Sequence, residues 1–204
     1  YFLDFNFNGS RKAFLDTGGS SVLLNFTGQH KTKGDEGTYL SSSVGLIVSS
    51  TGDYISSEQQ KININEALPF VKLSDKKEDK AAFGVISDAE DPNESTREYK
   101  MGNFVSVSEK TEDDNRIVIN SLGEGGIWVT NINGDLENGD FITTSDIPGY
   151  GMKQDDDLLH NYTVAKITCD CSFDLDSEIY NCEEFEFEGQ IYRKAFVGCT
   201  YHCG

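Results

Sequence analysis

The sequence predicts an all-β fold of about ten short strands. Helical periodicity is nearly absent, the apolar stretches are short and rich in β-branched and aromatic residues, and 20 Gly against 3 Pro mark tight turns. Strands of this kind build one large or two small barrel-like or clip-like β units. In chain order, we expect strands at residues 2–7, 22–26, 45–48, 69–73, 83–86, 104–107, 117–119, 127–132, 164–167 and 185–187. Helix is expected only around residues 155–160 and 58–63.

Changes in composition divide the chain into three expected parts. Residues 1–100 form an N-terminal β unit that ends in a polar linker at 88–100, residues 101–168 a second β unit, and residues 169–204 a cysteine-rich C-terminal subdomain. The segment 88–100 (DAEDPNESTREYK) also fits a solvated surface loop, because it has few apolar residues and many charges. The chain begins at Tyr1 rather than Met, which favours a fragment of a longer precursor.

The charge balance excludes whole classes of partner. With 17 Lys and Arg against 35 Asp and Glu, the net charge is −18 at pH 7. A surface this negative repels the phosphates of nucleic acids and the headgroups of anionic membranes. No apolar run approaches the ~20 residues that a membrane helix needs. We therefore expect neither a nucleic acid nor a membrane as partner.

The cysteines are gathered near the end of the chain, in the last 36 residues: Cys169, Cys171, Cys182, Cys199 and Cys203. Two disulfides with one thiol left over would suit an oxidising compartment, and reduced buried thiols are the second interpretation. A zinc site that uses His202 is the third, but the Cys-x-Cys and Cys-x-x-x-Cys spacings differ from the two-residue knuckles of structural zinc sites.

A glycine-rich segment holds the first candidate site. Glu124 lies within Ser121-Leu122-Gly123-Glu124-Gly125-Gly126-Ile127-Trp128, beside the only tryptophan of the chain. A desolvated glutamate can act as a general acid on a glycosidic bond, while an aromatic face stacks a sugar. Trp128 and Tyr150 are the candidates for substrate binding. The alternative is that the glycines form a turn and Trp128 belongs to the core.

Asp16 is a second catalytic candidate. The segment Phe14-Leu15-Asp16-Thr17-Gly18-Gly19-Ser20 looks like the Asp-Thr-Gly loop of aspartic proteases. Those enzymes need two such aspartates that share one proton, and the chain has no second signature. A hairpin turn explains the segment as well.

Histidines provide the remaining catalytic candidates. His30 ends the stretch 25–30, next to the end of an expected strand, and a histidine is a suitable base near neutral pH. His160 follows an acidic turn, and one helical turn would place Asp156 on the same face at i, i+4, where a carboxylate can orient the imidazole. A capped turn with solvated acids is the alternative.

A calcium-binding loop is the only metal site that the acidic segments suggest. Oxygen-bearing residues stand at every second position of residues 131–137, but the twelfth position holds Ile142 where a bidentate acid is required. Hairpin turns explain the Asn-Gly-Asp repeats better. We expect no cofactor and no metal.

Four segments together carry a resemblance to a viral family: NFTGQH (25–30), GLIVSSTGDYI (45–55), INSLGEGGIWVTNINGDLENGDFITTSDIPGYGMKQDDDLLHNYTVAKIT (119–168) and CEEFEFEGQIYRKAFVGCTYHCG (182–204). They resemble the C-terminal region of structural proteins of giant and algal (chlorovirus-type) DNA viruses. That region is similar to the intramolecular-chaperone autoproteolytic domain of phage tailspikes and neck appendages. Residues 1–24 and 88–112 resemble this family least, and the cysteine-rich end departs from the phage pattern.

The resemblance implies a virion-associated terminal fragment at the host cell surface, which degrades the polysaccharide of the algal cell wall by hydrolysis or elimination. One alternative is a chaperone and autoprotease domain that forms a homo-trimer and cleaves itself from a spike-type precursor. Another is a glycan-binding virion module without enzymatic activity. The phage cleavage residues do not map onto particular positions of this chain.

Overall fold

The fold is all-β, as predicted. The computed structural model describes residues 3–15, 28–39, 41–54, 68–101, 104–110 and 114–203, which form fourteen strands and three single-turn 3₁₀ helices without an α-helix. No helix among these residues is long and apolar enough to span a membrane. Contacts group the chain into two units: Tyr1–Phe26 with Glu90–Asn115, and Thr27–Ala89 with Arg116–Gly204. The domain boundaries expected at residues 100 and 168 stay a prediction.

The first unit is a four-stranded antiparallel sheet. Its order is β1 (Leu3–Phe7), β2 (Ser10–Leu15), β8 (Phe104–Glu109) and β7 (Thr96–Met101). A two-residue Asn8-Gly9 turn with φ of 51° and 78° joins β1 to β2, as hairpins of this type require. Strand β7 occupies residues 96–100 of the segment 88–100, and the role of this segment as a linker stays a prediction. An edge strand tolerates alternating polar residues, which local composition reads as a loop.

A buried ion-pair cluster ties β7 to the segments on either side of the β7–β8 hairpin. The guanidinium of Arg97 bonds to Glu90 through Nε at 2.6 Å and to Asp114 through Nη1 at 3.0 Å, and its side chain is only 4 % exposed. Burial by itself would lower the pKa of Arg97, but the hydrogen bonds to Glu90 and Asp114 outweigh it and raise this pKa. The charge of Arg97 is therefore permanent.

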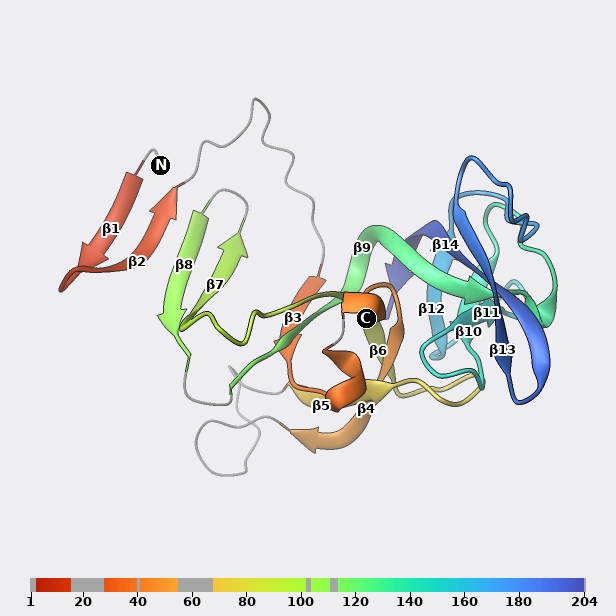
Figure 1. Cartoon of the computed structure of the whole chain (residues 1–204), viewed down its shortest axis with the longest axis horizontal. Coiled ribbons are helices and arrows are strands. Elements are labelled where there is room, and N and C mark those ends of the chain that lie inside the picture. Colours follow the sequence, from red (N-terminus) through yellow and green to blue (C-terminus); the bar gives the residue numbers. More distant parts are fainter. Residues whose placement is uncertain are drawn as a thin grey trace. The chain divides into compact units, whose positions relative to one another are not determined.

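The second unit contains the other ten strands and the 3₁₀ helices η1 (Glu36–Thr38), η2 (Ser41–Ser43) and η3 (Asn131–Asn133). Strand β14 pairs with both β12 and β9, so the pairings β9–β14–β12–β10–β11–β9 form a closed cycle (Figure 1). Strands β6, β4, β5 and β3 extend the sheet from β9, and β13 pairs with β14. The strands are β3 (Gly28–Thr32), β4 (Ile47–Tyr54), β5 (Pro69–Leu73), β6 (Ala82–Ala89), β9 (Ile117–Thr130), β10 (Phe141–Thr144), β11 (Gly151–Lys153), β12 (Thr163–Ile167), β13 (Asn181–Phe187) and β14 (Gln190–His202).

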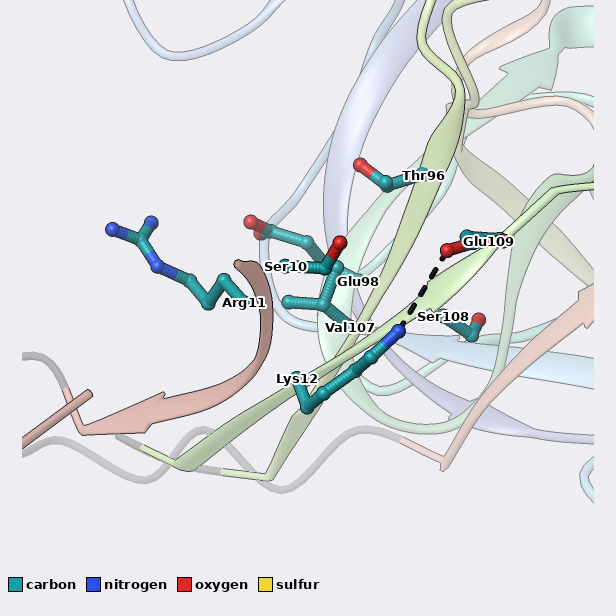
Figure 2. Close-up of a pocket in the computed structure, with 8 residues that line it drawn as sticks. All are labelled: Ser10, Arg11, Lys12, Thr96, Glu98, Val107, Ser108 and Glu109. Atoms are coloured by element: carbon teal, nitrogen blue, oxygen red, sulfur yellow. Dashed lines mark ion pairs between the residues drawn. The ribbon is translucent and has the colours of Figure 1, made fainter. Parts of the chain in front are cut away.

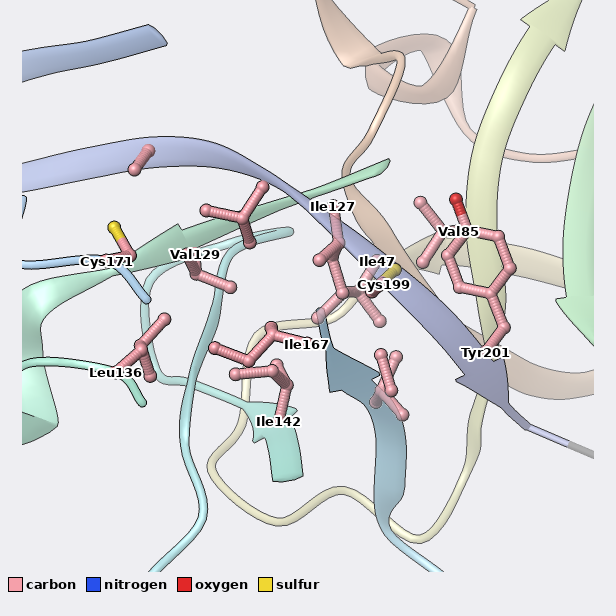
Figure 3. Close-up of a cluster of buried hydrophobic side chains, with 14 of the residues drawn as sticks. Ile47, Val85, Ile127, Val129, Leu136, Ile142, Ile167, Cys171, Cys199 and Tyr201 are labelled. Carbon is pink, nitrogen blue, oxygen red and sulfur yellow. The ribbon is translucent and has the colours of Figure 1, made fainter. Parts of the chain in front are cut away.

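The main hydrophobic core lies inside this cycle of strands. Ile127 and Val129 of β9 meet Ile142 of β10 and Ile167 of β12, and all four are 0–1 % exposed (Figure 3). A second cluster around Ile119 packs where β9 pairs with β6 and β3. Both clusters use the odd-numbered positions of β9, because successive side chains of a strand point to opposite faces.

One long strand replaces the two short strands and the glycine-rich loop that were expected at residues 117–132. Residues Ile117–Thr130 form β9 without interruption. A Cβ atom at Gly125 would overlap with the ring of Tyr201, and one at Gly126 with the ring of Phe196. The glycines therefore make room for aromatic rings on the paired strand β14, rather than for a turn.

The helix expected at residues 155–160 is wrong. Residues 155–158 form bends, and the Nε2 atom of Gln154 donates to the carbonyl oxygens of Asp156 at 3.0 Å and Leu158 at 2.6 Å. These bonds satisfy the backbone locally, so no helical hydrogen bonds are needed. The second expected helix, at residues 58–63, lies outside the described residues.

The disulfides expected among the C-terminal cysteines do not form, and all five cysteines are free. Cys171 and Cys199 are 0 % and 2 % exposed and pack into the main core as small apolar side chains. Burial raises the pKa of Cys199 to about 12 and that of Cys203 to about 12, which keeps both as thiols at neutral pH. The reduced-thiol interpretation describes the structure.

Candidate functional site

Strands β9 and β14 carry a second set of side chains on the surface opposite to the core. Trp128 lies across from Phe196, Gly126 from Gly198, and Glu124 from Thr200. Their neighbours Ile127 and Val129 point into the core. The term outer face is used below for Glu124, Gly126, Trp128, their three partners on β14, and the side chains in contact with them.

An aromatic cluster forms one end of the outer face. The Trp128 and Phe196 rings are 5.3 Å apart, and the Tyr150 ring stacks on Phe185 at 5.5 Å with an angle of 19°. The Nζ atom of Lys194 lies 5.2 Å from the centre of the Trp128 ring, 5.7 Å from Tyr150 and 5.9 Å from Phe185. Three ring faces therefore surround one ammonium group, an arrangement that stabilises a cation.

Polar contacts hold Lys194 in this position. Its Nζ atom lies 3.2 Å from a carboxylate oxygen of Glu183 and donates to the hydroxyl of Tyr150 at 3.4 Å. Burial alone would lower the pKa of Lys194, but the hydrogen bonds to Glu183 and Tyr150 outweigh it and raise this pKa. Lys194 is therefore a fixed cation among half-buried aromatic rings.

The other end of the outer face is polar. The Thr200 hydroxyl is 3.3 Å from Nε2 of His202, and the Phe141 ring meets the His202 ring edge-on at 6.1 Å. Lys166, opposite Thr200 on β12, places its Nζ atom 5.8 Å from the centre of the Phe141 ring. At ~3.3 Å per residue, Glu124 lies about 13 Å along β9 from Trp128. The outer face is thus long enough for an extended ligand.

The two candidates for substrate binding, Trp128 and Tyr150, come together in the aromatic cluster. The sequence pattern did not identify Lys194, Phe185 and Phe196, which complete the cluster through the pairing of strands distant in sequence. The residue pattern of β14, with Tyr192, Lys194 and Phe196 at every second position, was the available signal.

Glu124 shares the outer face with Trp128, but its surroundings differ from the expected ones. It lies within strand β9 rather than in a loop, and its side chain is exposed. It makes no hydrogen bond or ion pair with other described residues. Because a general acid of this kind needs a desolvated carboxyl, the exposure of Glu124 does not favour that role.

His30 forms a pair that the sequence did not reveal. Its Nε2 atom is 3.0 Å from the hydroxyl oxygen of Ser121 on the neighbouring strand β9, and its ring lies 5.3 Å from that of Phe83. The Ser121 hydroxyl also donates to the carbonyl oxygen of Gly28 at 3.2 Å, and Ser121 is 4 % exposed. A serine this buried serves to join β3 to β9 rather than to meet a substrate.

The environment of His30 predicts a pH dependence of stability. Burial lowers the pKa of His30 below the ordinary value of 6.5, so folding favours the neutral ring. As pH falls below about 6.5, the unfolded chain takes up a proton that the folded chain does not, and stability falls. We expect the thermal midpoint of the wild type to drop more than that of His30→Gln between pH 7.5 and 5.5. Equal drops would contradict a buried neutral His30.

Asp156 and His160 are brought together as expected, although not by a helix. Both carboxylate oxygens of Asp156 lie 3.0 Å from Nε2 of His160, whose ring stacks on Tyr162 at 4.6 Å. A bond from the Leu158 backbone N–H and the contact with His160 lower the pKa of Asp156. The pair thus combines an imidazole with an ionised orienting carboxylate in the exposed loop between β11 and β12.

Asp16 lies outside the described residues, so its catalytic role stays a prediction. In the described part of the chain, no three His, Cys, Asp or Glu side chains are grouped so as to hold a metal ion.

A pocket of about 290 Å³ lies on the four-stranded sheet of the first unit (Figure 2). Strands β2, β7 and β8 line it, and Lys12 and Glu109 form an ion pair across it at 3.7 Å. Both side chains are largely exposed, and the pocket contains none of the predicted site residues.

Comparisons with known proteins identify no relative: no family model, no curated protein and no solved structure matches the chain. The function of the chain is therefore inferred from the geometry of the outer face and from the sequence resemblance.

Proposed function

We propose that this protein is a virion-associated module that binds the cell-wall polysaccharide of an algal host on its outer face. The observation that carries the proposal is the aromatic cluster around Lys194. Half-buried ring faces can stack the apolar side of a sugar, and a fixed ammonium can donate hydrogen bonds to sugar hydroxyls. The viral resemblance supports the host surface as the place of action. A barrel-like second unit would hold the rings on a rigid support.

The charge of the chain favours a neutral polysaccharide over an acidic one. The net charge is −18, and Glu183 of β13 lies beside Lys194, while Glu184 and Glu186 lie on the other face of β13. Lys194 and Arg193 are already in ion pairs with Glu183 and Glu184. A polyuronate would meet mostly like charge on approach.

Binding to wall oligosaccharides is expected to change the intrinsic tryptophan fluorescence, because Trp128 is the only tryptophan and belongs to the cluster. By calorimetry, Trp128→Ala should weaken binding at least tenfold, a loss of about 1.4 kcal/mol or more. Tyr162→Ala is the matched control, since this aromatic residue contacts His160 in the β11–β12 loop. If the wild type fails to bind isolated walls, or if Trp128→Ala binds as well as the wild type, the proposal is wrong.

A second candidate function is degradation of the wall polysaccharide, favoured by the hydrogen-bonded Asp156–His160 pair. An imidazole oriented by a carboxylate can transfer protons near neutral pH. Release of soluble sugar from walls tests this function, with His160→Gln and Glu124→Gln as variants. Activity that is unchanged in both variants would show that neither residue takes part in the mechanism. Binding without sugar release would contradict degradation and support the binding module.

The chaperone and autoprotease role implied by the resemblance stays a prediction, as does the homo-trimer. Mass analysis of a longer expressed precursor tests it. Self-cleavage near Tyr1 would support the role, and an intact precursor would oppose it.

A further inference from the structure

Strand β1 is an edge of the sheet that the described residues of the first unit form. It is the last strand in the order β1–β2–β8–β7, and no described strand pairs with its far side. Its residues Asp4, Phe5, Asn6 and Phe7 are all exposed, with Phe5 at 48 % and Phe7 at 67 %. The backbone N–H and C=O groups of such an edge form a template for another strand.

The opposite edge of the same sheet has the features that discourage pairing. Besides the buried Arg97, strand β7 contains the charged residues Glu98 and Lys100, whereas β1 contains one charged residue, Asp4. The charge of Asp4 is balanced within the sheet by Arg11, whose Nε atom is 3.1 Å away. Charged edge strands resist association, so β1 is the edge open to a partner.

The first unit is a small sheet of four strands. A small sheet gains stability when another element extends or covers it. An additional strand at β1 would bring a further apolar row beside Phe5 and Phe7.

We propose that β1 pairs antiparallel with β1 of a second copy of this chain, about a two-fold axis at Phe5. This register places Phe5 opposite Phe5, Leu3 opposite Phe7, and Asp4 opposite Asn6. Aromatic and apolar residues then face one another, and no like charges meet, which is the pattern that stabilises cross-strand pairs. The two four-stranded sheets become one continuous sheet of eight strands, with an isologous interface.

Sedimentation velocity and native mass spectrometry of the full chain test this dimer over a range of concentrations. The wild type is expected to shift from monomer to dimer as concentration rises. Phe5→Lys places like charges directly opposite each other on the axis and should raise the dissociation constant at least tenfold, as should Phe5→Asp. An equal mixture of the two variants should restore dimers that contain one chain of each, because the charges then attract.

Ile191→Lys is the matched control, because Ile191 is an exposed apolar residue (65 %) of the β13–β14 hairpin in the second unit. It should associate like the wild type. A wild type that stays monomeric or forms trimers overturns the proposal, and so does undiminished association of Phe5→Lys. A mixture that fails to form mixed dimers, although both variants keep the wild-type circular dichroism, overturns the register. The test is independent of glycan binding.

Discussion

Replacing Arg97 by methionine is expected to lower the free energy of unfolding of the first unit by about 3–5 kcal/mol. Arg97 is 4 % exposed, and its partners Glu90 and Asp114 are 9 % and 16 % exposed. Without the guanidinium, two nearly buried carboxylates lose the counter-charge of Arg97 and also repel each other. The cost is large because it contains the desolvation of both acids, not only the lost attraction.

Two further variants separate these contributions. Arg97→Lys keeps the charge but cannot reach both acids with a planar fork, so we expect an intermediate loss. The triple variant Arg97→Met, Glu90→Gln, Asp114→Asn removes all three charges and should regain part of the stability lost by Arg97→Met alone.

Hydrogen exchange of the β7 and β8 amides measures the effect within the first unit, and exchange of β9 amides serves as the internal reference. Protection in β7 and β8 that is unchanged by Arg97→Met would contradict a stabilising role for the buried cluster. A triple variant that is less stable than Arg97→Met would contradict the account based on the buried charge of the two acids.

Ile127→Ala is expected to destabilise the second unit by about 2–5 kcal/mol, measured by urea denaturation. Ile127 is 0 % exposed and lies in the main core beside Val129 and Ile142. Truncation to alanine loses the transfer free energy of the side chain and leaves a cavity, because the closed cycle of strands restricts collapse around it.

The neighbouring residue provides the comparison. Trp128→Ala removes a larger side chain, but one that is half-exposed on the outer face, so its effect on the free energy of unfolding should be smaller than that of Ile127→Ala. The effects on glycan binding should have the opposite order. If the two variants lost equal stability, the alternation along β9 would differ from that of the structure.

Local pattern predicted the strands where apolar residues cluster. The strand expected at residues 69–73 coincides with β5, and those at 83–86, 104–107 and 164–167 lie within β6, β8 and β12. Local pattern failed where a neighbouring strand supplies the packing. The glycines of β9 are compatible with a strand because the rings of Tyr201 and Phe196 of β14 pack over them. Strand β7 is polar because it lies at an edge.

The sequence by itself determined the all-β class, the excess of acids that disfavours polyanionic partners, and the single tryptophan as a candidate for binding. It also indicated Asp156 with His160, because these residues are only four positions apart. The tertiary structure alone decided that Trp128, Tyr150, Phe185 and Lys194 form one cluster. The physical reason is that 59 residues separate β9 from β14, and the register of these two strands depends on the whole core that closes between them.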